Sequence, residues 1–213
     1  PLLHCLAVET IIRNGAIEGV IVESKSGRQA ILAERVVDCT GDADIAFLAG
    51  CPYTELAIKD RMSVTGVFNC SGVDRKKFIK YTENNPKTYR DWNQDWKQDT
   101  TGKEDHLNTP YLSEEFKEAA AEGIITQESA DRMCGSWSAL NSLGEATNLN
   151  LVHLNNIDCT DVKDLTRAEI TSRQEVSHAV KALQAKVPGF ESAHLRNHAM
   201  TIGTRDSRKI VGL

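Results

Sequence analysis

The sequence has no excess of positive charge and no long apolar run. Its 213 residues carry 25 Lys and Arg against 30 Asp and Glu, for a formal net charge of −5. Nucleic acids and anionic membrane surfaces attract basic faces, so we expect neither as a partner. No apolar stretch approaches the roughly 20 residues that a membrane-spanning helix needs, and no signal peptide is visible. Because 40% of the residues are hydrophobic, the chain can bury a core as a globular protein.

Close groups of metal or redox ligands are also missing. The six cysteines stand at positions 5, 39, 51, 70, 134 and 159, without a CxxC pair. Cys5, Cys39 and Cys70 lie in apolar runs, where a reduced thiol behaves as a small hydrophobe. Reduced thiols predict a cytoplasmic protein. His194 and His198 lack the Glu of an HExxH motif and a third ligand, so no metal site is expected.

What the sequence does contain at its start is a set of strand patterns. "LAVETII" alternates apolar and polar residues, and "IEGVIVES" and "RQAILA" are two further strand candidates. The turns between them carry Asn14-Gly15 and Ser26-Gly27, which suit tight hairpins. We therefore expect a three-stranded antiparallel meander over residues 5–33.

The stretch "VVDCTGDADIAFLAG" then predicts a strand at 35–39, a corner at Thr40-Gly41 and a helix capped by Asp42. This corner has three possible roles. Glycine lets a nucleotide approach the backbone closely, and a helix start offers free N–H groups. Alternatively, Asp38 is a phosphatase-type nucleophile with Mg²⁺, although such a loop needs a second aspartate at position 40. The third possibility is a plain turn.

The acidic residues of the corner limit what it can bind. Asp42 and Asp44 would repel a pyrophosphate. They suit the positive end of the helix dipole or the hydroxyls of a ribose.

The remaining residues predict a larger mixed unit. We expect a strand in "MSVTGVFNCSG", a helix that Asp74 caps and Pro86 stops, and a polar loop at 86–110 that carries Trp92 and Trp96. Short helices are expected at 113–122 and 126–133, and strands in "WSAL" and "ATNLNLVHL".

The clearest helix lies near the C-terminus, in "TRAEITSRQEVSHAVKALQAKVPGF". Thr166 and Glu169 have the spacing of a capping box, and Pro188-Gly189 ends the pattern. Its apolar stripe consists of Val176, Ala179, Val180, Leu183 and Val187. The fold class is therefore α+β: a meander with a Rossmann-type strand-helix corner, then a mixed domain with a long C-terminal helix.

These segments, in this order, resemble a known family. The stretch from "VETIIRNG" to "FLAG" resembles the part that follows the Rossmann unit in two-dinucleotide-binding-domain flavoproteins, with Cys39-Thr40-Gly41 at its Ala/Cys-Thr-Gly position. "GDADIAFLAGCPY", "DLTRAEITSRQEV", "VPGFESAHL" and "IGTRDSRKIVG" resemble FAD-dependent oxidoreductases. The resemblance implies FAD as cofactor and hydride transfer between a small organic substrate and flavin.

The resemblance also assigns residues. Val8, Thr40, Gly41 and Asp42 would lie along the nucleotide end of FAD, with the Val8 backbone contacting adenine. Such flavoproteins begin with GxGxxG, which holds the pyrophosphate, and this motif does not occur here. The chain therefore resembles an internal piece of a longer flavoprotein: residues 1–60 as a partial FAD-binding domain, and 61–213 as a substrate domain with the start of the segment that returns to the flavin. FAD is expected in the intact parent.

Arg205 and Arg208 are the candidate catalytic residues. They are three apart in "IGTRDSRKI" and would share one face of a helix. In the flavoprotein interpretation, a guanidinium holds an anionic substrate or stabilises charge near the flavin. The alternative is an ion pair with Asp206 or another acid. His153 likewise either faces a substrate cavity or is a satisfied core histidine.

The rival interpretation is a non-enzymatic α+β module. An incomplete dinucleotide-binding domain leaves strand edges and apolar faces uncovered. Such a chain would bind a partner or form a homo-oligomer to bury them.

Overall fold

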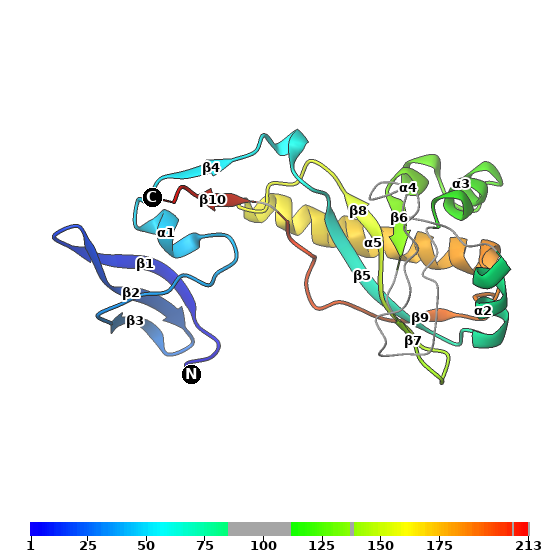
Figure 1. The fold of residues 1–213 in the computed structure, drawn as a ribbon, viewed down its shortest axis with the longest axis horizontal. Coiled ribbons are helices and arrows are strands. Elements are labelled where there is room, and N and C mark those ends of the chain that lie inside the picture. The colour runs from blue at the N-terminus through cyan, green and yellow to red at the C-terminus, as the bar shows by residue number, and fades with distance from the viewer. Residues whose placement is uncertain (85–111, 137–138, 206, 213) are drawn as a thin grey trace. The chain divides into compact units, whose positions relative to one another are not determined.

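The computed structural model describes residues 1–84, 112–136, 139–205 and 207–212 (Figure 1). The chain forms two compact units, one of Pro1–Arg61 with Asp206–Leu213 and one of Met62–Arg205. Both mix helices with antiparallel strands, which confirms the α+β class. None of the helices in this described part of the chain has the length and apolar character that crossing a membrane requires.

The first unit begins with the predicted meander. Strands β1 (Leu6–Arg13), β2 (Ala16–Ser24) and β3 (Gly27–Leu32) pair antiparallel in the order β1-β2-β3 (Figure 1). The first turn has positive φ at both Asn14 and Gly15, 50° and 76°. Positive φ at both central residues is the requirement of the turn that matches strand twist, so the Asn-Gly pair accounts for the hairpin.

The rest of the first unit matches the prediction in part: the helix after the corner forms, but it begins at Asp44 and the strand before it does not form. Helix α1 (Asp44–Leu48) is followed by β4 (Tyr53–Glu55), the short helix η1 (Ile58–Asp60) and finally β10 (Arg208–Ile210), which pairs with β4. The strand predicted at 35–39 is wrong, because these residues have no strand assignment. A strand needs a neighbouring strand for its backbone hydrogen bonds. Within the described residues, β1 and β3 pair only with β2, so neither edge of the meander pairs with residues 35–39.

The second unit is built on an antiparallel sheet. Its order is β6 (Met133–Ser136), β8 (Ala146–Leu154), β5 (Val64–Ser71) and β9 (His194–His198), with β7 (Ala139–Leu140) also paired to β8. The long helix α5 (Val162–Lys186) packs against β5 and β8 (Figure 1). Helices α2 (Arg75–Asn84), α3 (Ser113–Ala121) and α4 (Gln127–Asp131) complete it.

Several local predictions in this unit are confirmed. Asp74 caps α2 through the Lys77 amide at 3.1 Å, and the strands at β5 and β8 lie where their patterns placed them. The helix predicted at 126–133 is shorter, because Met133 already belongs to β6. The loop at 86–110, with Trp92 and Trp96, lies outside the described residues.

Helix α5 begins earlier than predicted. Asp161 caps it by accepting hydrogen bonds from the amides of Lys163 at 2.7 Å and Asp164 at 3.3 Å. The capping box at Thr166 and Glu169 is therefore wrong: the Thr166 hydroxyl donates to the Val162 carbonyl inside the helix. A carboxylate that already satisfies the first amides allows the helix to begin at Val162.

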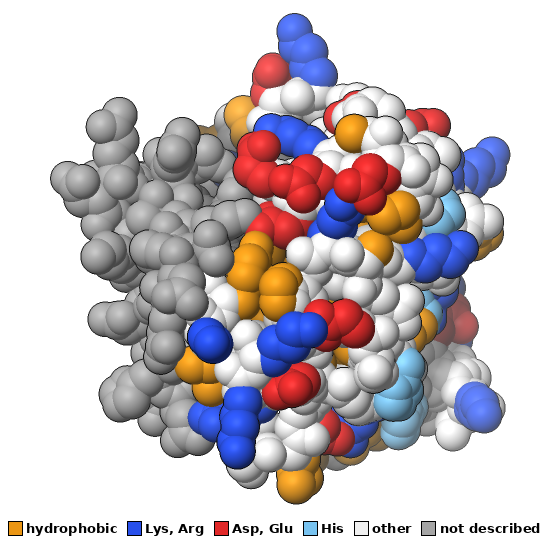
Figure 2. Space-filling model, turned by 90° about the vertical axis from the view of Figure 1, so that its right-hand side faces the viewer, with side chains coloured by type: hydrophobic (Ala, Val, Ile, Leu, Met, Phe, Trp, Pro, Cys, Tyr) orange, Lys and Arg blue, Asp and Glu red, His pale blue; other side chains and the backbone are white. Residues whose placement is uncertain are grey.

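The two units have very different cores. In the second, the predicted stripe of α5 is buried and joins an aromatic core made of Phe68, Phe78, Phe116 and Phe190. In the first, Val22 and Ile45 are the buried hydrophobic residues among those described. On the described part of the face drawn in Figure 2, acidic and basic side chains lie interspersed among apolar ones.

Candidate functional site

Asp38 and Thr40 build the corner of the first unit. Asp38 Oδ1 accepts hydrogen bonds from the Thr40 amide at 3.0 Å and the Thr40 hydroxyl at 2.7 Å, and Oδ2 accepts from the Ala46 amide at 2.9 Å. Thr40 Oγ1 in turn accepts from the Asp44 amide at 2.9 Å. The amides that open α1 are thus already used, so the prediction that they are free for a ligand is wrong.

The ionised form of Asp38 is stabilised by these contacts. Partial burial raises the pKa of the Asp38 carboxyl, but hydrogen bonds from Thr40, Ala46 and Ile45 outweigh it and hold the pKa below its ordinary value. The carboxylate therefore stays charged at neutral pH and acts as an acceptor within its own turn. Because its two oxygens face these donors, Asp38 is not arranged as a nucleophile.

Gly41 and Ala43 give the corner its shape. Both are left-handed, with φ of 88° and 55°, a conformation that is unfavourable for alanine. A Cβ built on Gly41 would meet no atom within 4 Å, so the backbone here is open to approach. The reversal at Ala43 also leaves Asp42 without a capping contact, which corrects the predicted cap: its carboxylate accepts from the Ser207 hydroxyl at 2.5 Å.

Arg208 lies in β10 with its guanidinium packed into the same unit. It donates to Asp44 at 2.7 Å, lies 3.8 Å from a Glu55 carboxylate oxygen, and stacks 3.9 Å above the Phe47 ring. Only 12% of its side chain is exposed. These contacts are those of the ion-pair alternative, and the catalytic role of Arg208 stays a prediction. Arg208 lies in the strand β10, so the condition under which Arg205 and Arg208 would share the face of a helix is not met.

Val8 is an irregular position in β1. The β1–β2 register pairs Ala7 with Val22 and Glu9 with Ile21, which leaves Val8 at a bulge. A bulged residue is left unpaired in the ladder, so its backbone is a candidate for contact with a ligand. Two residues on, the Thr10 hydroxyl donates to the Leu48 carbonyl at 3.1 Å and ties β1 to α1.

In the second unit, Arg205 lies near His153 of β8. Burial is the main reason that the pKa of the His153 imidazole is lowered, and the charge of Arg205 lowers it further. Contacts with the carbonyls of Cys134, at 3.2 Å, and Asn150 oppose this shift. His153 is therefore a neutral ring fixed by backbone carbonyls, as expected of a satisfied core histidine. The local pair of Arg205 with Asp206 lies outside the described residues.

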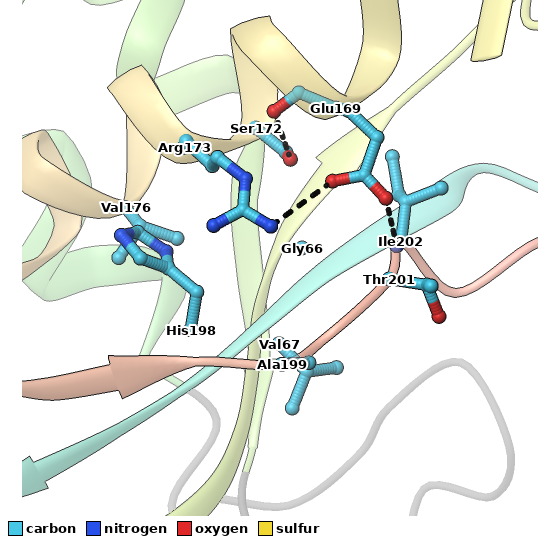
Figure 3. Close-up of a pocket in the computed structure, with 10 residues that line it drawn as sticks. All are labelled: Gly66, Val67, Glu169, Ser172, Arg173, Val176, His198, Ala199, Thr201 and Ile202. Atoms are coloured by element: carbon cyan, nitrogen blue, oxygen red, sulfur yellow. Dashed lines mark hydrogen bonds and ion pairs between the residues drawn. The ribbon is translucent and has the colours of Figure 1, made fainter. Parts of the chain in front are cut away.

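A small pocket opens between α5 and the sheet of the second unit (Figure 3). Figure 3 shows Arg173 pointing to Glu169, 3.5 Å away, with His198 rising from β9. Glu169 also accepts from the Ile202 amide at 2.6 Å. The cavity between these side chains has a volume of about 10 Å³, room for about one water molecule. It is too small for a nucleotide.

One polar cluster of the second unit resembles a catalytic triad without its geometry. Ser129 Oγ and Glu175 Oε2 both approach Nδ1 of His178, at 2.9 and 3.2 Å. A proton relay needs the two partners on different ring nitrogens, so this is a structural network, closed by Arg132 on Glu175 at 2.6 Å. Across the described residues, no three potential ligands are grouped to hold a metal ion.

The sequence interpretation missed the roles of Asp38, Phe47 and Ser207. Asp38 could have been found, because an aspartate two residues before a threonine commonly closes a turn on the following backbone. The contacts of Phe47 and Ser207 could not, because they join residues more than 150 positions apart in the sequence.

A family model described as FAD dependent oxidoreductase matches residues 1–213, the whole chain. No curated protein and no solved structure matches it. The family match agrees with the resemblance carried by the corner and by the three later segments.

Proposed function

Because the chain belongs to the FAD-dependent oxidoreductase family, we propose that it forms part of an enzyme transferring hydride between a small anionic organic substrate and FAD. The observation that carries the proposal is the open corner at Thr40-Gly41. Gly41 is left-handed, and a Cβ built on it would meet no other atom within 4 Å. The family match over the full chain adds support. A cofactor can approach such a backbone closely.

The groups at the corner fit one end of FAD better than the other. Asp42 and Asp44 are acidic, and the cation beside them, Arg208, is already paired with Asp44 and lies near Glu55. A pyrophosphate there would meet the negative charge of Asp42 and Asp44 and a cation, Arg208, that is already paired. The neutral adenosine offers hydroxyls and ring edges that backbone groups can bind. We therefore assign Gly41, Thr40 and the Val8 backbone to the nucleoside end of FAD.

The substrate end of the proposal rests on Arg205. When bound, FAD supplies the acceptor or donor of the hydride. The task left to the chain is to hold the substrate, and a guanidinium does so by a forked contact with a carboxylate. Arg205 is half-buried and its charge acts on the neighbouring His153. We propose that it orients an anionic substrate.

The first test is flavin binding. The intact parent protein, titrated with FAD, should quench flavin fluorescence and retain a yellow colour through gel filtration. A protein that leaves FAD free at every concentration would contradict the assignment of the corner.

The second test addresses Arg205 in the intact enzyme. Arg205→Lys should lower kcat/KM by a factor that corresponds to about 1–3 kcal/mol of transition-state stabilisation, because a lysine loses the forked hydrogen bonds. Flavin bleaching by a set of small carboxylates provides the measurement. Arg196→Lys is the matched control, since Arg196 is half-exposed and pairs with Glu145 at 3.0 Å. Equal kcat/KM in wild type and Arg205→Lys would leave Arg205 a structural residue.

The rival proposal is a non-enzymatic module that binds a partner or forms a homo-oligomer. What favours it is the apolar surface of the first unit, where Leu2, Leu3, Leu6, Leu32 and Val37 are each more than half exposed. Exposed apolar patches are typical of interaction sites. A protein that elutes as an oligomer and binds no flavin would support this rival over the enzyme.

A further inference from the structure

The tripeptide Asp-Cys-Thr occurs twice, at 38–40 and 158–160, and makes the same turn each time. Asp158 Oδ1 accepts from the Thr160 amide at 2.9 Å and its hydroxyl at 2.8 Å. The contacts of Asp38 with Thr40 are 3.0 and 2.7 Å. The turn is therefore a property of the tripeptide alone, and it cannot by itself indicate a ligand.

The two turns differ in what the aspartate does next. Helix α5 has its own cap in Asp161, whereas α1 has no side-chain cap at Ala43. There, Asp38 Oδ2 reaches past the turn to the Ala46 amide at 2.9 Å. One carboxylate thus joins both ends of the segment from Thr40 to Ala46, and the left-handed Gly41 and Ala43 form the arch between them.

This arch needs an anchor. A left-handed alanine is disfavoured and persists only where its surroundings hold it. The first unit has little core to do so, since Ile45 is the buried residue of α1. The arch also contains the bonds of the Asp44 amide to Thr40 and of Ser207 to Asp42. Asp38 is the one of these acceptors whose hydrogen bonds lie on both sides of the arch.

We propose that Asp38 is a positioning residue for FAD: it touches no ligand and holds the Thr40-Gly41 backbone in the conformation that receives the nucleoside end. The inference rests on the proposed function, because it assumes that the corner contacts FAD. It adds a residue that the family resemblance does not assign. It also predicts how substitutions at this position rank.

The ranking follows from the atoms. Asp38→Ala removes both acceptors. Asp38→Asn keeps one oxygen for Thr40 but turns an NH₂ toward the Ala46 amide, which places donor against donor. Asp158→Ala is the matched control, because it opens the same turn in the other unit, where Asp161 still caps the helix.

The experiment measures two quantities on the whole protein. Amide hydrogen exchange over residues 40–46 reports the arch without any ligand. Titrations with FAD and with FMN report the flavin site, and FMN lacks the adenosine that the corner would contact. We expect Asp38→Ala to speed exchange and to weaken FAD about tenfold, the effect of one lost hydrogen-bonded anchor. The affinity of Asp38→Ala for FMN should equal that of wild type. Asp38→Asn should give exchange rates and an FAD affinity between those of wild type and Asp38→Ala. Asp158→Ala should match wild type in both measurements.

The other outcomes separate the two proposals. Faster exchange in Asp38→Ala with unchanged FAD affinity would overturn the positioning role while the proposed function stands. Equal losses of affinity for FAD and FMN in Asp38→Ala would indicate general destabilisation of the protein and would also overturn the positioning role. A wild-type protein that binds no FAD would contradict the proposed function. The role of Asp38 would then be limited to stabilising its own turn. If Asp38→Ala does not fold, Asp38→Asn decides between these outcomes by the same measurements.

Discussion

The two Asp-Cys-Thr turns have the same hydrogen bonds and opposite surroundings. The residue before the first, Val37, is 82% exposed, and the residue before the second, Ile157, is 5% exposed. Cys39 is exposed and Cys159 is buried. A short polar motif therefore sets the backbone of a turn, while burial depends on which unit surrounds it.

The same contrast separates the two units. The second turn belongs to an apolar cluster with Val64, Leu154 and Ile202, near a larger aromatic core. The first unit is held by polar contacts such as Arg208 with Asp44 and Ser207 with Asp42. A typical hydrogen bond contributes about 1 kcal/mol net. Substitutions that remove hydrogen bonds at the corner should therefore destabilise the first unit more than substitutions of exposed side chains that make none.

The largest expected difference lies at the residue before each turn. Ile157→Ala should lower the free energy of unfolding of the second unit by about 2–5 kcal/mol, because it leaves a cavity in a buried cluster. Val37→Ala removes an exposed side chain and should change stability by less than about 0.5 kcal/mol. Urea unfolding followed by circular dichroism measures both. Similar effects of the two substitutions would contradict the contrast in burial.

The residue after each turn gives the next largest effect. Gly41→Ala should destabilise the first unit by about 1–2 kcal/mol, because alanine is strained at a φ of 88°. The cost comes from the backbone alone, since no atom lies within 4 Å of the new Cβ. Hydrogen exchange of the β1–β3 amides measures it. Gly212→Ala is the control, with neither a positive φ nor close neighbours, and an equal loss there would refute the explanation by strain.

Local signals in the sequence predicted the parts of the fold that depend on neighbouring residues. The Asn14-Gly15 hairpin, the cap at Asp74 and the end of α5 at Pro188-Gly189 all follow from nearby backbone chemistry. The strand at 35–39 failed because a strand also needs a partner, which a pattern within one segment does not reveal.

The candidate site was predictable to the same extent. The corner at Thr40-Gly41 was recognised, but the cap was assigned to Asp42, the residue next to the helix. Asp38 instead accepts the hydrogen bond from the Ala46 amide of α1. Asp42, which precedes the left-handed Ala43, accepts from Ser207. Contacts of Arg208 with Asp44 and Phe47 depend on tertiary structure and left no local signal.

The stability of the second unit should fall as the pH falls, because it contains the partly buried imidazole of His153. Burial, aided by Arg205, lowers the pKa of His153 from 6.5, so the unfolded chain binds the proton more readily. The resulting stability is full above the unfolded pKa and is lost as pH falls toward the folded pKa, with a slope of at most about 1.4 kcal/mol per pH unit for one group. His153→Gln should remove this part of the loss. Urea unfolding at several pH values between about 7.5 and 5 tests it, and parallel curves for wild type and variant would exclude His153 as the cause.

The smallest expected effect compares the aspartates nearest each helix. Asp161→Ala should lower the stability of the second unit by about 1 kcal/mol, the usual contribution of an N-cap, because its carboxylate accepts from two opening amides of α5. Asp42→Ala should leave α1 intact, because the amides of α1 bond to Asp38 and Thr40 instead. Hydrogen exchange at the first turn of each helix separates these effects from global unfolding. Faster exchange in α1 upon Asp42→Ala would restore Asp42 as the cap and remove the reason for treating Asp38 as the anchor of the corner.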